Sequence, residues 1–120
     1  FFSMSQENPI NMIKNIVEKV EKDENIKTKL SDWNVVFQFT PNAGTAFFME
    51  IKGQNIQIVE GKNDGATTTF ICENDDLIQM LKGELDPLKA LFSGKLKVEG
   101  NMMESQKLNT LLNKIKSSDA

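Results

Sequence analysis

Near the start of the chain, apolar residues recur about every three or four positions, which is the spacing of a helix with one buried face. Asn8 and Pro9 precede them and suit a helix start, because Asn caps free N–H groups and Pro fits the first helical position. We therefore expect a helix over 9–22. The polar run 23–30 predicts a short second helix or a loop. The apolar stripe of the first helix comprises Met12, Ile13, Ile16, Val17 and Val20.

From Trp33 onward the period changes to two, which is the alternation of strands. Turn-forming Gly, Pro and Asn residues separate the alternating segments. We expect the four resulting strands to follow one another as a meander. They lie at 33–39, 46–51, around 56–58 and at 67–72, with turns at 41–44, 53–55 and 61–65.

Helical spacing returns after the fourth strand. Asn74 or Asp75 is expected to cap a helix that ends at Gly83. Asp86-Pro87 is expected to begin a second helix by the same cap-plus-proline logic, and Gly94 to end it.

Strict alternation over 95–99 predicts a fifth strand, and Gly100-Asn101 precedes a last helix with a broad apolar stripe. Strands grouped apart from most of the helices predict an α+β fold, with helices covering a five-stranded, antiparallel-rich mixed sheet. We expect the 120 residues to form a single domain, 1–120, whose ends at 1–7 and 117–120 are flexible.

The amino-acid composition limits the kinds of catalysis and binding that the chain can perform. The chain has no His and no Tyr, and all 14 of its basic residues are Lys. Lack of His removes the commonest general base and metal ligand, which excludes Ser-His-Asp and Cys-His catalysis within the chain. A net charge of −3 gives no electrostatic argument for nucleic-acid binding. Cys72 cannot form an internal disulfide and is expected to be a small buried residue in a reducing compartment. We expect no catalytic residue, no metal and no cofactor.

Three features leave alternatives open. In the segment 46–51, Phe48 lies on the face opposite Phe47, so both faces are apolar, as in a central strand or in one that lines a ligand cavity. The broad stripe of the last helix suits either a core helix or a lid over a cavity. Asp75 and Asp76 suggest acid or metal chemistry, but their place at a helix start is better explained by the helix dipole.

Over the second half of the chain, an acidic residue, a spaced apolar helix, a Gly-x-Leu-x-Pro turn and a Gly-Lys-Leu-Lys motif stand in order. The positions are Asp76-Leu77, Leu81, Gly83, Leu85, Pro87, Ala90, Phe92, Gly94-Lys95-Leu96-Lys97 and Gly100-Asn101, followed by Ser105-Gln106-Lys107-Leu108. Together they resemble the sterol carrier protein 2 domain family, and most closely its branch at the C-terminus of peroxisomal multifunctional enzyme type 2. The order of predicted elements agrees along essentially the whole chain.

The resemblance implies that the helices and the sheet enclose an apolar tunnel, and that the protein binds and transfers fatty acid, fatty acyl-CoA, sterol or phospholipid without catalysis. Lys95, Lys97 or Lys107 would pair with a carboxylate or phosphate at the tunnel mouth, although Lys95 and Lys97 equally suit a solvated strand face. Gln106 would supply a polar contact. The implied ligand-binding residues are Phe48, Met80, Leu81, Leu91, Phe92, Met103, Gln106, Leu108, Leu111, Leu112 and Ile115.

The resemblance further implies a monomer with a lipid ligand, transient membrane contact and no nucleic-acid partner. An intracellular location, cytoplasmic or peroxisomal, fits the family, but the chain ends in Ser118-Asp119-Ala120 rather than in a recognisable peroxisomal signal. Two alternatives to a lipid carrier remain. One is a protein-interaction scaffold, and the other is a substrate-presenting module of a larger lipid-metabolising enzyme.

Overall fold

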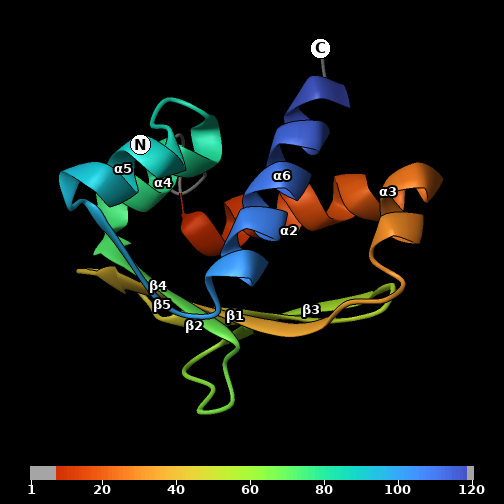
Figure 1. Cartoon of the computed structure of the whole chain (residues 1–120), viewed down its shortest axis with the longest axis horizontal. Coiled ribbons are helices and arrows are strands. Elements are labelled where there is room, and N and C mark those ends of the chain that lie inside the picture. Colours follow the sequence, from red (N-terminus) through yellow and green to blue (C-terminus); the bar gives the residue numbers. More distant parts are fainter. Residues whose placement is uncertain (1–7, 119–120) are drawn as a thin grey trace.

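Five strands form one mixed sheet in the spatial order β3-β2-β1-β4-β5 (Figure 1). The structure is a computed structural model that describes residues 8–118. Of the flexible ends expected at 1–7 and 117–120, residues 1–7 and 119–120 therefore lie outside the described residues. The predicted α+β class and the five-stranded mixed sheet are confirmed. The strands are β1 (Asn34–Asn42), β2 (Phe47–Lys52), β3 (Asn55–Glu60), β4 (Thr68–Glu73) and β5 (Leu96–Gly100).

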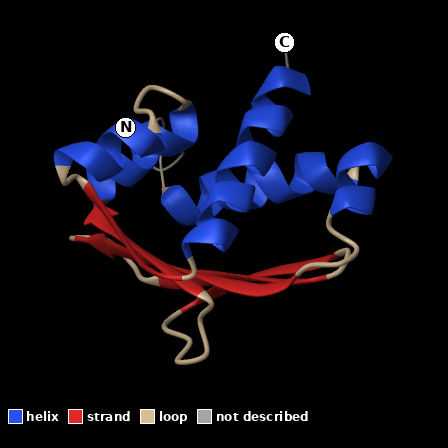
Figure 2. Ribbon diagram, viewed as in Figure 1, coloured by secondary structure: helices blue, strands red, loops and turns tan. Residues whose placement is uncertain are grey.

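All the described helices lie on one face of the sheet, within the hollow that its curvature forms (Figure 2). The last helix runs through Ser118, so residues 117–118, which were expected in a flexible end, continue it. The chain thus forms two layers, and the apolar faces of the helices meet a single face of the sheet. The helices are α2 (Pro9–Glu21), α3 (Glu24–Lys29), α4 (Asn74–Lys82), α5 (Pro87–Ser93) and α6 (Met102–Ser118).

The predicted meander is wrong, because β4 pairs with β1 and not with β3. β1 and β4 run parallel, with Phe39 opposite Phe70, whereas the other neighbouring strands are antiparallel. The chain leaves β3 at one edge of the sheet, passes below the face that carries no helices, and enters β4 beside β1 (Figure 1). Alternation predicts which residues share a strand face, but it does not determine which strands become neighbours.

Gln38 holds this crossing connection against the helix-free face of β1. Its Nε2 donates hydrogen bonds to the carbonyl oxygens of Phe47 at 3.0 Å and Gly61 at 3.1 Å. Its Oε1 accepts a hydrogen bond from the N–H of Asn63 at 2.7 Å. Both ends of the buried amide are therefore satisfied, and one side chain joins β1, β2 and the connection.

Of the side-chain caps predicted for α2, α4 and α5, those of α2 and α5 agree with the structure and that of α4 differs. Asn8 caps α2 and Asp86 caps α5, each accepting a hydrogen bond from a backbone N–H, at 2.8 Å and 3.1 Å respectively. The predicted cap of α4 is wrong, because its N-cap residue is Glu73, whose side chain makes no capping hydrogen bond. Asp75 and Asp76 lie in the first turn of α4, where carboxylates complement the helix dipole.

β1 is longer than predicted, because Pro41 and Asn42, expected in a turn, continue the strand and pair with Cys72 and Glu73 of β4. The Asn42 Nδ2 donates a hydrogen bond to a carboxylate oxygen of Glu73 at 2.8 Å. This bond engages the Glu73 side chain at the junction with α4, which accounts for the missing cap. The parallel neighbour therefore extends β1 and also fixes where α4 begins.

The core lies between the sheet and the helices. Phe37, Phe47 and Ile51 are fully buried, each with 0% of its surface exposed. Phe39 stacks against Phe47 with ring centroids 4.8 Å apart and against Phe70 at 5.2 Å. These rings give the sheet an aromatic surface on which the helices pack.

Candidate ligand-binding site

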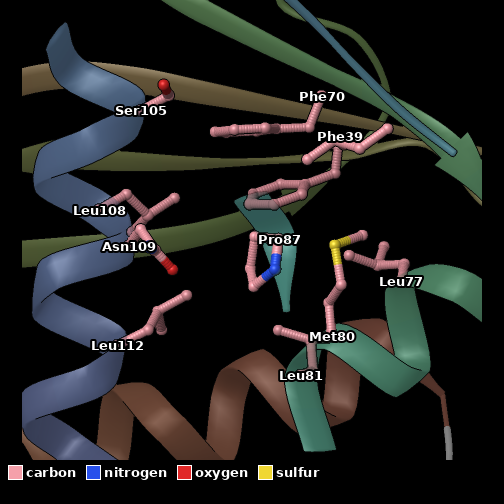
Figure 3. Close-up of a pocket in the computed structure, with 11 residues that line it drawn as sticks. Phe39, Phe70, Leu77, Met80, Leu81, Pro87, Ser105, Leu108, Asn109 and Leu112 are labelled. Carbon is pink, nitrogen blue, oxygen red and sulfur yellow. The ribbon is translucent and has the colours of Figure 1, made fainter. Parts of the chain in front are cut away.

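An apolar cavity of about 70 Å³ lies between α6 and α4, over β1 and β4 (Figure 3). We call it the α4–α6 cavity. Phe39 and Phe70 contribute aromatic rings to its wall, and only Ser105 and Asn109 contribute polar side chains. Its lining residues are Phe39, Phe70, Leu77, Met80, Leu81, Pro87, Leu96, Ser105, Leu108, Asn109 and Leu112.

Helix periodicity explains how α4 and α6 provide the wall. Leu108 and Leu112 are one helical turn apart on α6, so they lie on the same face of the helix. Figure 3 shows both side chains directed from α6 toward Met80 and Leu81 of α4. Two amphipathic helices therefore face each other across the cavity, with the aromatic strand residues beneath them.

A second apolar cavity, of about 30 Å³, lies among α2, the sheet and α6, and we call it the α2–α6 cavity. It shares Phe39, Leu81 and Leu112 with the α4–α6 cavity. The two cavities therefore adjoin at these side chains. Its other lining residues are Ile13, Ile16, Val17, Val20, Met49, Ile51, Ile56, Leu111 and Ile115.

Both cavities are smaller than a lipid. An engineered cavity of about 150 Å³ in a protein core accommodates benzene, and the α4–α6 cavity has about half that volume, at about 70 Å³. A long acyl chain or a sterol therefore enters only if the helices or their side chains move apart.

The structure brings together the predicted residues that lie on α4 and on the inner face of α6. These are Met80, Leu81, Leu108, Leu111, Leu112 and Ile115, which line one or both cavities. Their burial follows from the apolar stripe that the sequence shows.

The other predicted residues lie elsewhere. Met103 and Gln106 line an open groove on a different face of α6. Leu91 and Phe92 of α5 line neither cavity, and the Phe92 side chain is 81% exposed. Phe48 shares a face with Gln38 on the helix-free side of the sheet. Both cavities lie on the face that the helices cover, so Phe48 lines neither of them.

Sequence reasoning missed the aromatic wall formed by Phe39 and Phe70. Alternation puts Phe39 on the same strand face as Phe37, and the predicted fourth strand includes Phe70. What the sequence does not show is that these two strands are neighbours, and only their pairing brings both rings to one cavity.

Cys72 is buried in the core, and its thiol is held protonated. Burial, and then the nearby carboxylates of Asp76 and Glu73, raise its pKa from 9.0 to about 11. A protonated thiol is a poor nucleophile. Within residues 8–118, no group of three or more His, Cys, Asp or Glu side chains is arranged to hold a metal ion. No helix in this described range has the length and apolar character needed to cross a membrane.

Comparison with known proteins shows which family the chain is similar to. The model of the SCP-2 sterol transfer family matches residues 13–113. Peroxisomal multifunctional enzyme type 2 of Mus musculus is 36% identical over 84 residues, covering 66% of this chain and 11% of that protein. Hydroxysteroid dehydrogenase-like protein 2 of Bos taurus is 34% identical over 100 residues, covering 77% of this chain and 24% of that protein. The chain thus spans a minor part of these curated relatives.

A solved structure supports the fold. The sterol carrier protein domain 2 of Helicoverpa armigera superimposes with a TM-score of 0.70 at 22% sequence identity. The match covers 92% of this chain and 90% of that one. The two chains therefore share an architecture over nearly their whole length.

Proposed function

Since the chain belongs to the SCP-2 sterol transfer family, we propose that it binds a lipid in the apolar space beneath α6 and carries it without changing it chemically. The observation that carries the proposal is the pair of adjoining apolar cavities that share Phe39, Leu81 and Leu112. Family membership supports lipid binding and transfer in general. The ligand class, which is a fatty acid, fatty acyl-CoA, sterol or phospholipid, is the finer part of the proposal.

The driving force is the removal of apolar ligand surface from water. Burial of each methylene group contributes about 0.8 kcal/mol. Association itself costs about 4–15 kcal/mol in lost translational and rotational freedom. Ten buried methylenes contribute about 8 kcal/mol, which exceeds the lower end of this cost, and about fifteen would be needed to reach micromolar affinity.

The α6 helix is the wall that we propose to move when a ligand enters. Its contact with α4 is less continuous than a core contact, because Ser105 and Asn109 place polar side chains among the apolar lining. Leu108, Leu111 and Ile115 of the same helix are buried. A ligand chain would take over part of the apolar contact that these residues now make with the protein.

The amino-acid composition of the chain fits a lipid carrier that performs no catalysis. The chain has no His, and the raised pKa of Cys72 keeps its thiol protonated at neutral pH. The relatives include a protein named as a peroxisomal enzyme, of which the matched part is 11%. Within a longer protein of that kind, the domain would present its lipid to a neighbouring domain. Cys72 suits a reducing compartment within the cell.

The test is a displacement titration. A fatty acid with an environment-sensitive fluorophore is bound to the purified protein and then displaced by unlabelled dodecanoate, so that the label itself is not the measured ligand. The Leu112→Phe variant fills the junction of the two cavities, and we expect its affinity to fall about tenfold or more, equivalent to about 1.4 kcal/mol. The matched control, Leu88→Phe, adds the same ring at a side chain that is 53% exposed and should bind as wild type.

Overpacking can also destabilise the fold, typically by about 1–3 kcal/mol. Thermal unfolding by circular dichroism therefore accompanies each titration. If Leu112→Phe does not fold, Leu81→Phe replaces it, because Leu81 also lines both cavities. Absence of saturable binding to monodisperse wild-type protein would overturn the proposal.

A further inference from the structure

A groove of about 420 Å³ lies between the C-terminal end of α3 and the outer side of α6. We call it the lysine groove. It uses a different face of α6 from the α4–α6 cavity, and the two have no lining residue in common. Its volume falls in the range of about 300–1,000 Å³ that is usual for small-molecule sites. Its lining residues are Lys29, Leu30, Trp33, Met103, Gln106, Lys107, Thr110, Leu111 and Lys114.

Two of the lysines that line the groove, Lys29 and Lys114, lie close together. Lys29 and Lys114 line the same groove, and their interaction, including mutual repulsion, lowers the pKa of Lys114. In the part of the chain that the structure describes, neither amino group forms an ion pair. The third lysine, Lys107, is paired with Glu104 at 3.7 Å. The groove therefore holds a close pair of cations that a bound anion would stabilise.

The floor of the same groove is apolar. Leu30 is fully buried at 0% exposure, Leu111 is buried and Trp33 is half-buried. Leu111 also lines the α2–α6 cavity, so the groove floor adjoins the apolar interior. Gln106 and Thr110 add hydrogen-bonding groups along the α6 side. A cationic rim over an apolar floor fits a molecule in which an anionic group is joined directly to an apolar chain.

We propose that the lysine groove binds the carboxylate or phosphate head group of an amphipathic lipid, with Lys29 and Lys114 contacting the anion. Trp33 and Leu111, which lie over the buried Leu30, contact the first part of the apolar chain, which then continues beneath α6. This inference rests on the proposed function, since it assigns the head-group end of the lipid-binding site. Lys95, Lys97 and Lys107, which the sequence suggested for this role, are not required by it.

The test compares ligands that share a chain and differ in the head group. Dodecanoate, dodecyl phosphate and uncharged dodecanol are titrated below their micelle thresholds. Trp33 is the single tryptophan of the chain and lines the groove, so its fluorescence reports occupancy there. Displacement of the fluorescent fatty acid reports binding independently. Inorganic phosphate and acetate, titrated alone, serve as free anions without a chain.

The variant is Lys29→Ala/Lys114→Ala, and its matched control is Lys95→Ala/Lys97→Ala, which removes the same charge from the region of β5. We expect the first variant to bind dodecanoate and dodecyl phosphate about tenfold more weakly and dodecanol as wild type does. We expect the control to bind all three ligands as wild type does. Circular dichroism checks that both variants remain folded.

The outcomes separate this inference from the proposed function. If wild type binds dodecanol and dodecanoate, but Lys29→Ala/Lys114→Ala weakens neither or weakens both equally, the head-group assignment fails while the lipid-carrier proposal stands. If wild type binds neither ligand, both proposals fail. If inorganic phosphate binds as tightly as dodecyl phosphate, the ligand is a free anion and the inference is overturned.

Discussion

Phe39 and Phe70 stack on adjacent parallel strands, in the same register and with their ring centroids 5.2 Å apart. Both rings line the α4–α6 cavity. This pair links the least predictable feature of the fold, the β1–β4 pairing, to the candidate site. The stability of the stack and the shape of the cavity therefore depend on one another.

Phe70→Ala should lower the free energy of unfolding by about 3–5 kcal/mol, because it removes a buried ring and leaves a larger cavity. Urea denaturation monitored by circular dichroism measures the loss. Phe92→Ala is the matched control, since its ring is 81% exposed, and it should change stability by no more than about 0.5 kcal/mol. Equal losses in the two variants would contradict the assignment of Phe70 to the core.

Gln38→Leu should destabilise the protein by about 2–3 kcal/mol, because it leaves the Asn63 N–H and the Gly61 carbonyl without their partner. Amide hydrogen exchange at 61–65 should accelerate more than in the helices, since the connection loses its anchor. The control is Gln57→Leu, which changes an exposed glutamine on the same face of the sheet. Unchanged exchange at 61–65 would show that Gln38 does not hold the connection.

Gly100→Ala should cost more stability than Gly94→Ala, although both glycines have positive φ angles, of 94° and 85°. At Gly94 an added Cβ meets nothing within 4 Å, so only backbone strain of about 1–2 kcal/mol is expected. At Gly100 the added Cβ would collide with the backbone carbonyl of Thr67. Urea denaturation of both variants checks the order, and a smaller loss for Gly100→Ala would contradict the close approach of its backbone to the start of β4.

Cys72 should react slowly with a thiol reagent in the folded protein. Since its pKa rises from 9.0 to about 11, the thiolate fraction at pH 8 should be about 100-fold lower than in the unfolded chain, and burial slows the reaction further. Absorbance with Ellman's reagent measures the rate, with guanidinium-unfolded protein as the reference. Rates within a few-fold of each other would show that the thiol is accessible.

The raised pKa of Cys72 also predicts how the free energy of unfolding changes with pH. Below about pH 9 the thiol is protonated in both the folded and the unfolded chain, so its contribution to stability does not change. Between pH 9 and about 11 the unfolded chain ionises first, so stability should fall as pH rises. Cys72→Ala should remove this part of the pH dependence when unfolding is measured across that range.

The part of the candidate site that lies on α6 could be predicted, because its apolar residues recur at helical spacing within one segment. The apolar stripe of α6 fits either a core helix or a lid, and the family resemblance indicates Leu108, Leu112 and Ile115 as lining residues, which border the two cavities. The face of Phe48 could not be predicted, because alternation shows that both faces of β2 are apolar, but not which face the helices cover. Lys29 and Lys114 lie 85 positions apart in the sequence, so nothing local to either one indicates that they share a groove.

By itself, the sequence determined the element types, the caps of α2 and α5, which residues share a strand face, and the family resemblance. Each of these depends on interactions among residues a few positions apart or on a motif with fixed spacing. Only the tertiary structure decided the β1–β4 pairing and the single face of the sheet that the helices cover. It also decided that one side of α6 lines the α4–α6 cavity and another side lines the lysine groove. The physical reason is that these features arise from contacts between distant segments, whose free energy depends on how the whole chain packs.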